Sequence, residues 1–213
     1  MGNEISSFMD FLQHGNQPND ATGRVDELSD VKFPDGELLY DNKKMRWFDE
    51  NSNKCYMLFP KALSIEWSSD NRYWKWHSKL SSSNKTIKII ELLNVCWLEI
   101  NGKIKESDLS PNTLYEAVFE IKITEDAYGW NVPVTISLTE PDGKIYKNKV
   151  TLKEKKKAEW VKIPIGEFKV VPDKSGDGEI KFSMYKYGGH WKRGMILKGI
   201  VIEPKVNKNK TSH

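Results

Sequence analysis

The stretch AVFEIKIT, residues 117–124, decides the fold class of this chain. Its odd-numbered positions are all apolar, and three of its four even-numbered positions are polar or charged. Because side chains on a β-strand alternate between the two faces of a sheet, this period of two predicts a half-buried strand. The segment therefore indicates a sheet with one face on a core and the other toward polar surroundings.

Strand-like segments continue on both sides of this stretch. Residues 92–100 form a more continuous apolar run, which predicts a strand buried on both faces. Asp142-Gly143 is a strong hairpin signal, and Asn101-Gly102 predicts a second turn. Within this β-rich region, short helices are expected only at 60–63 and 87–93. Many short strands between turns indicate an all-β antiparallel sandwich or barrel, with further strands expected at 132–138, 145–152, 160–165, 180–185 and 195–203.

The change from polar to β-rich sequence predicts three parts. Residues 1–39 are expected to be an extension, with a short helix at 5–13 and a polar linker or disordered arm after it. Residues 40–206 are expected to form one domain, and residues 207–213 a polar tail.

Composition narrows the class of protein further. The chain has 213 residues, 38% of them hydrophobic, and a formal net charge of +3, which is too small to indicate nucleic-acid binding by itself. No apolar run reaches the length of a transmembrane helix, and the acidic N-terminus lacks the apolar core of a signal peptide. We therefore expect a cytoplasmic protein without a signal peptide.

The first six residues, MGNEIS, match a lipidation pattern. With Met1 removed, Gly2 would be the acylated residue of an N-myristoylation site. A chance match of common residues is the alternative. A single acyl chain would give only weak membrane association.

Catalytic motifs are missing from the sequence. No G-x-S-x-G, H-E-x-x-H, phosphate-binding loop or dinucleotide-binding glycine pattern occurs, and abundant carboxylates alone do not identify a glycosidase pair. Cys55 and Cys96 match no zinc motif. We expect a protein that is not an enzyme and needs no cofactor or metal.

Aromatic residues concentrate in SIEWSSDNRYWKWHSK, residues 64–79. Trp74 and Trp76 should share one face of a strand. Such a face can line the core or bind a ligand. Aromatic rings flanked by groups such as Asn71 and Arg72 suit a sugar, whose C–H patches pack on the rings while polar groups bond its hydroxyls.

Lysines concentrate between residues 144 and 157. This stripe fits either a solvated hairpin or a patch for RNA or nuclear localisation, whose candidate residues are Lys153, Lys155, Lys156 and Lys157.

Four long blocks resemble the phloem protein 2 lectin family. They begin with KCYMLFPKALSIEWSSDNRYWKWHSK, ELLNVCWLEINGKI and LSPNTLYEAVFEIK, and end with DGEIKFSMYKYGGHWKRGMILKGIVIEPK. These blocks are similar to those of the cucurbit phloem lectins and of the tobacco lectin Nictaba. Together they cover about residues 54–205. The resemblance implies a jelly-roll-like β-sandwich, a homodimer, and a lectin for N-acetylglucosamine oligomers such as chitin fragments and glycoprotein N-glycan cores. It also implies phloem companion cells and sieve elements as the location, with a role in defence and wound sealing.

The resemblance also nominates site residues. It implies Trp67 and Trp74 as sugar contacts, with Arg72, Asn71 and Trp76 beside them. Glu179 is the leading acidic candidate and Glu167 a second one. Where relatives often carry an acidic residue, this chain has Lys186.

Cucurbit relatives suggest an alternative function. They bind a filament-forming phloem protein through disulfides and carry RNA, so the resemblance offers Cys55 and Cys96 for an intermolecular disulfide. Both cysteines lie in apolar runs, and two buried, reduced thiols are the competing expectation.

Overall fold

The computed structural model describes residues 28–171 and 178–206, and the chain divides into two units, Met1–Asp30 and Val31–His213. The predicted lipidation site at Gly2, the helix at 5–13 and the tail at 207–213 lie outside the described residues.

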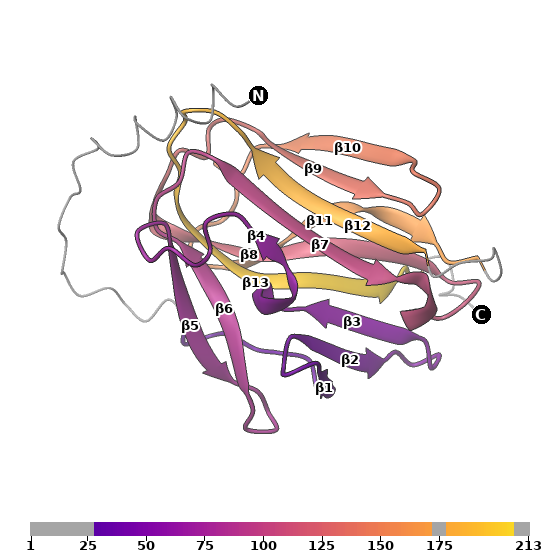
Figure 1. The fold of residues 1–213 in the computed structure, drawn as a ribbon. Coiled ribbons are helices and arrows are strands. Elements are labelled where there is room, and N and C mark those ends of the chain that lie inside the picture. Colours follow the sequence, from indigo (N-terminus) through magenta and orange to yellow (C-terminus); the bar gives the residue numbers. More distant parts are fainter. Residues whose placement is uncertain (1–27, 172–177, 207–213) are drawn as a thin grey trace, which may run out of the picture. The chain divides into compact units, whose positions relative to one another are not determined.

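Two antiparallel sheets form the second unit (Figure 1). The strands of the larger sheet are β1 (Glu37–Leu39), β2 (Lys44–Phe48), β3 (Lys54–Leu58), β5 (Trp74–Leu80), β6 (Thr86–Leu92), β8 (Leu114–Tyr128), β11 (Trp160–Lys169) and β13 (Arg193–Pro204). The smaller sheet has the order β10 (Ile145–Val150), β9 (Val134–Thr139), β12 (Glu179–Lys186), β7 (Leu98–Lys105) and β4 (Ser64–Ile65). The described helices are two short 3-10 turns, η1 (Pro60–Ala62) and η2 (Glu106–Asp108). The expected all-β sandwich is confirmed.

Strand β13 organises the larger sheet. One edge pairs with β8 along most of its length, and the other edge pairs with β6 through residues 195–197 and with β3 through residues 200–202. A bulge between Leu197 and Gly199 separates these two pairings. Gly199 has φ +156°, and a Cβ there would lie 2.3 Å from the carbonyl oxygen of Leu58, so a larger residue does not fit at this crossing.

The core lies between the sheets, where the inward residues of both meet. It includes Phe119, Ile121, Ile136, Phe182 and Met184, each fully or almost fully buried. The inward face of residues 117–124 is confirmed, because Phe119 and Ile121 belong to this core. The strand is not half-buried as expected, because Val118, Lys122 and Thr124 on its other face are buried as well. The hairpin at Asp142-Gly143 is also confirmed, joining β9 to β10.

Several local expectations were wrong. Residues 87–93 are not helical, because β6 pairs with both β5 and β13. Residues 92–100 are not one strand, since β6 ends at Leu92 and β7 begins at Leu98. Asn101-Gly102 is no turn but the middle of β7, where the two sheets approach so closely that a Cβ on Gly102 would meet Ile200 at 2.7 Å. The sheet also begins at Glu37, inside the expected extension, because β1 pairs with β2.

Candidate functional site

The tryptophan-rich segment folds as a short strand, a loop and a long edge strand. Residues 66–73 connect β4 to β5. The loop is closed by backbone hydrogen bonds, in which Asp70 N–H donates to the Trp67 carbonyl at 2.9 Å and Trp74 N–H to the Asp70 carbonyl at 3.1 Å. At its tip Arg72 forms an ion pair with Asp70 at 2.7 Å, which lowers the pKa of the Asp70 carboxyl.

Two tryptophans of β5 form hydrogen bonds to the backbone of this loop. Trp74 Nε1 donates to the Glu66 carbonyl at 2.9 Å, and Trp76 Nε1 donates to the Ser68 carbonyl at 2.8 Å. The strand is regular here, with Trp74 opposite Leu92 and Trp76 opposite Ile90. Both rings therefore share the inward face, as the spacing predicts.

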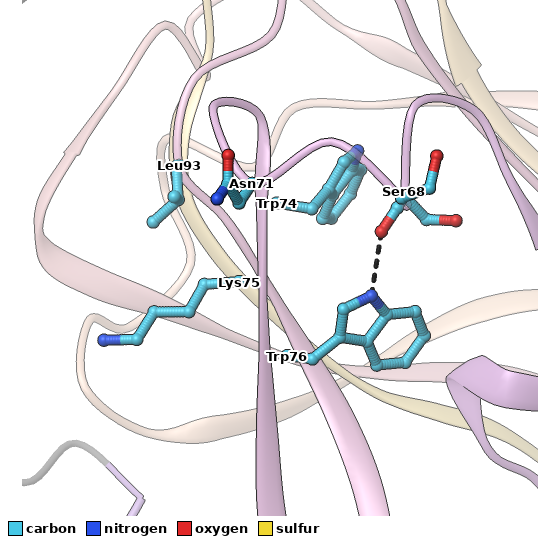
Figure 2. A pocket seen from close by; sticks show the side chains of 7 residues that line it. Ser68, Asn71, Trp74, Lys75, Trp76 and Leu93 are labelled. Atoms are coloured by element: carbon cyan, nitrogen blue, oxygen red, sulfur yellow. Dashed lines mark hydrogen bonds between the residues drawn. The ribbon is translucent and has the colours of Figure 1, made fainter.

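A pocket of about 320 Å³ opens beside these two rings (Figure 2). Figure 2 shows Trp74 and Trp76 one above the other, with Ser68 hydrogen-bonded to Trp76. The pocket combines aromatic and aliphatic walls with hydroxyl, amide and ammonium groups, and is lined by Ser68, Ser69, Asn71, Trp74, Lys75, Trp76 and Leu93. This mixture suits a small polar ligand with an apolar face.

The burial of Trp74 changes its expected role. Its side chain is only 1% exposed and belongs to the core, so it offers no free face for a sugar ring to stack on. Trp76 is half-buried, and the Lys61 ammonium lies 4.2 Å from its ring centroid. Trp76 is therefore the more accessible of the two rings, although the resemblance places Trp74 first.

Trp67 is the other accessible ring of the loop. It is half-buried, packs edge-on against Tyr73 at 6.1 Å, and has φ +62°. A bulky residue with positive φ costs about 1–2 kcal/mol, and such residues concentrate at functional sites. The loop thus holds Trp67 in a strained conformation, with Arg72 lying 5.2 Å from the Tyr73 ring next to it.

The expected acidic residues do not join this loop. Glu66 N–H bonds the Glu99 carbonyl, and Glu99 is opposite Tyr185, whereas Glu179 is opposite Lys105. Six residues of strand, about 20 Å, separate Glu179 from the end of β12 that lies nearest the loop. Glu179 binds Lys103 at 2.7 Å, which lowers its pKa.

Glu167 is also far from the pocket. It lies opposite Glu116 near the other end of the larger sheet and binds Lys205 at 2.7 Å. Neither carboxylate is therefore positioned to contact a ligand in the pocket.

An aromatic and polar cluster, which the sequence did not predict, lies where β7 begins and β12 ends. Tyr187 stacks on Trp97 at 4.4 Å and on Tyr185 at 5.0 Å, while Glu99 accepts hydrogen bonds from Trp97 Nε1 at 3.3 Å and Asn101 Nδ2 at 3.1 Å. Burial, together with Glu99, raises the pKa of Tyr187. The period of two in residues 97–101 and 183–187 would have shown these side chains on one face, had the strand pairing been known.

The lysine patch splits between two places. Lys147 and Lys149 lie on β10, but residues 153–157 follow in a separate loop. In this loop Lys156 pairs with Glu159, and Lys157 donates to the Glu125 carbonyl at 2.7 Å. The candidate RNA patch, which also includes Lys153 and Lys155, is thus partly engaged within the protein.

A buried lysine joins the segments behind the pocket. Lys192 has no exposed surface, and its ammonium donates to the carbonyls of Cys96 at 2.7 Å and His190 at 2.6 Å. Burial lowers the pKa of Lys192 to about 8. The backbones of Val95 and Lys192 also exchange two hydrogen bonds, so this contact fixes residues 93–97 against residues 188–192.

Both cysteines are free and buried, at 2% exposure each. Burial raises the pKa of Cys55 to about 12 and also raises the pKa of Cys96. The thiolate is the reactive form, so neither thiol is suited to exchange with a partner protein in the folded state.

We expect both thiols to resist labelling. Ellman's reagent at pH 8 should react with neither cysteine in native protein and with both in urea, and a non-reducing gel should show only monomer. Rapid labelling of either cysteine in folded protein would contradict this expectation.

Within the described residues, no group of three or more His, Cys, Asp or Glu side chains could hold a metal ion. Nor does that part of the chain contain a helix long and apolar enough to cross a membrane.

A β-sandwich with an aromatic loop pocket is thus the class of protein that the structure defines. The family model described as Phloem protein 2 matches residues 53–204, and the chain belongs to this family. It is 45% identical over 174 residues to Protein PHLOEM PROTEIN 2-LIKE A1 of Arabidopsis thaliana, covering 80% of this chain and 70% of that one. It is 41% identical over 171 residues to a protein named Lectin from Luffa acutangula, covering 80% of each.

Solved structures are more distant. A xylan-binding domain from Paenibacillus barcinonensis is 10% identical, with a TM-score of 0.37 over 68% of this chain and 87% of that one. A Podospora anserina mannanase is 6% identical, with a TM-score of 0.41 over 73% of this chain and 29% of that one. These scores are too low to support an argument about this chain.

Proposed function

We propose that this protein is a non-enzymatic lectin whose loop pocket binds N-acetylglucosamine oligomers, including chitin fragments and N-glycan cores. The observation that carries the proposal is the pocket itself, where Trp76 supplies an aromatic wall next to the Asn71 amide and the Ser68 and Ser69 side chains. Membership of the phloem protein 2 family and the relative named Lectin support the same function.

Within this proposal the ring contacts are Trp76 and Trp67, and Trp74 holds the loop in place. Asn71 and Arg72 are exposed at the loop tip and donate to sugar hydroxyl or acetamide oxygens. The acidic contribution expected from Glu179 and Glu167 is not part of the proposal, because both lie far along their strands from the loop. We also propose a location in phloem, which the family name supports, and a role in defence.

Titration with chitotriose tests the pocket. Wild-type protein should show saturable quenching of tryptophan fluorescence, and Asn71→Ala should weaken binding by about tenfold or less, as expected for one or two lost hydrogen bonds. Asn71 is exposed, so this variant should fold normally.

Ring variants complete the test. Trp76→Ala should remove most of the binding, whereas Trp47→Phe, at a half-buried ring on β2 near the opposite edge of the same sheet, should bind as wild type does. Equal chitotriose affinity in wild type, Asn71→Ala and a folded Trp76→Ala protein would refute the pocket assignment.

RNA carriage is the second candidate function, favoured by the exposed lysines of residues 147–157. Binding of an RNA oligomer that falls steeply with salt and is lost in a Lys153→Glu, Lys155→Glu variant would support it.

A further inference from the structure

The outward side of β9, β10 and β12 carries a patch that is separate from the loop pocket. Strand pairing places Lys149, Thr135 and Tyr185 in one row across these strands, and Lys147, Ser137 and Ser183 in the next. Their neighbours along the strands, Val134, Ile136 and Leu138, point into the core, so the rows face outward. We call this surface the outer patch, defined by Thr135, Lys147, Lys149, Lys181, Ser183 and Tyr185.

The outer patch is positively charged. Lys147, Lys149 and Lys181 are exposed, and none forms an ion pair with another residue in the described part of the chain. Two carboxylates border the patch. Glu99 lies on β7 and is hydrogen-bonded to Trp97 and Asn101, and Glu179 lies at the start of β12, where it is paired with Lys103. The residues that define the outer patch therefore include three ammonium groups and no carboxylate.

The centre of the outer patch is aromatic and rich in hydroxyls. Tyr187 covers one face of the Tyr185 ring. The next outward residue in the other direction along β12 is Ser183, whose side chain is too short to cover the opposite face. Ser183 donates to Asn101 Oδ1 at 2.7 Å, which leaves its oxygen able to accept a hydrogen bond. Thr135 stands beside Tyr185 and supplies a second hydroxyl.

This combination matches one kind of ligand. A polyuronate chain offers carboxylates for lysines, hydroxyls for Ser and Thr, and ring C–H faces for tyrosine. We propose that the outer patch is a second binding site, which takes an acidic polysaccharide of the polyuronate class. Four inter-strand steps, about 19 Å, separate the lysines of β10 from β4, where the pocket loop begins, and two steps, about 10 Å, separate Tyr185 of β12 from it. The two sites share no residue.

Binding of oligogalacturonate of defined length, measured by isothermal titration calorimetry, tests the proposal. Wild type should bind it with an affinity that falls with salt, and should bind the fully methyl-esterified oligomer at least tenfold more weakly. Lys147→Glu with Lys149→Glu should weaken oligogalacturonate binding by about tenfold or more. Lys43→Glu with Lys85→Glu, which makes the same charge change at exposed turns of the other sheet, should lose much less.

Two further measurements separate this site from simpler explanations. Thr135→Val with Ser183→Ala keeps every charge, so it should weaken oligogalacturonate binding several-fold yet leave binding of inorganic polyphosphate unchanged. Asn71→Ala should weaken chitotriose binding only, so failure of the loop pocket would not affect this test.

Three results would overturn the proposal. The first is no binding of oligogalacturonate by wild type, and the second is equal loss of binding in both charge-reversal variants. The third is an RNA oligomer that binds more tightly and competes at the outer patch. Circular dichroism and thermal melting would show that each variant is folded.

Discussion

Trp74→Ala is expected to lower the free energy of unfolding by about 3–5 kcal/mol, the range for removing a large aromatic side chain from a core. The ring is 1% exposed and packs in the cluster between the sheets. Its loss would also leave the Glu66 carbonyl without the hydrogen bond that it accepts at 2.9 Å. Urea unfolding followed by circular dichroism would measure the change.

Two comparisons show whether Trp74 acts through structure. Trp74→Phe keeps most of the apolar volume and loses the hydrogen bond, so it should cost about 1–3 kcal/mol and retain chitotriose binding in the folded fraction. Trp76→Ala should destabilise less, because Trp76 is only half-buried, yet should lose more sugar affinity. A Trp74→Phe protein that is fully stable but unable to bind chitotriose would show instead that Trp74 contacts the sugar.

The contrast between Trp74 and Trp76 illustrates what sequence can predict. Period two places both rings on one face, and the regular pairing of β5 with β6 agrees. Spacing alone does not say which ring is covered, because that depends on a loop that turns back over β5. The same loop fixes Trp67 at positive φ, a backbone state that no side-chain pattern indicates for tryptophan.

Local turn signals were reliable only where no partner strand competed. Asp142-Gly143 makes its hairpin at an exposed end of the sheet. Asn101-Gly102 has an equally good turn sequence, yet it is held straight by pairing with β12 residues some eighty positions away. Hydrogen bonds along a central strand outweigh the local preference, and nothing near Gly102 in the sequence reveals that pairing.

The acidic residues show which features of a site a sequence resemblance can predict and which it cannot. A block match places Glu179 in β12, and the structure agrees that this block forms a strand. The block match does not say which end of β12 lies near the loop. The strand register places Glu179 at the end of β12 that is far from the loop. The outer patch was likewise hidden, because its rows combine residues from three strands that only the pairing brings together.

The second large expected effect is a dependence of the free energy of unfolding on pH, caused by the buried Lys192. In the unfolded chain this amine has a pKa near its ordinary value of 10.5, and burial lowers it to about 8 in the folded protein. Between these values the unfolded state binds a proton that the folded state does not, so Lys192 makes stability rise with pH from about 8 to 10.5. Below pH 8 both states are charged, and burying the charge costs the full amount, about 3 kcal/mol.

Other groups titrate in the same pH range, so the test compares the stability of wild type with that of a variant that lacks Lys192. Cys55 and Cys96 have raised pKa values, and they make stability fall above about pH 9. Comparing wild type with Lys192→Met cancels most of that contribution. The stability of wild type relative to the Met variant should increase by up to about 3 kcal/mol between pH 7.5 and 10.

The Met variant also separates the charge of Lys192 from its hydrogen bonds. Loss of the bonds to the Cys96 and His190 carbonyls does not depend on pH, so it shifts the whole curve, whereas the charge changes the slope. Urea unfolding at several pH values would show both. A wild type and a Met variant whose stabilities run parallel from pH 7.5 to 10 would mean that Lys192 keeps an ordinary pKa in the folded protein. A rising difference would show that burial holds the pKa of Lys192 well below its ordinary value in the folded protein.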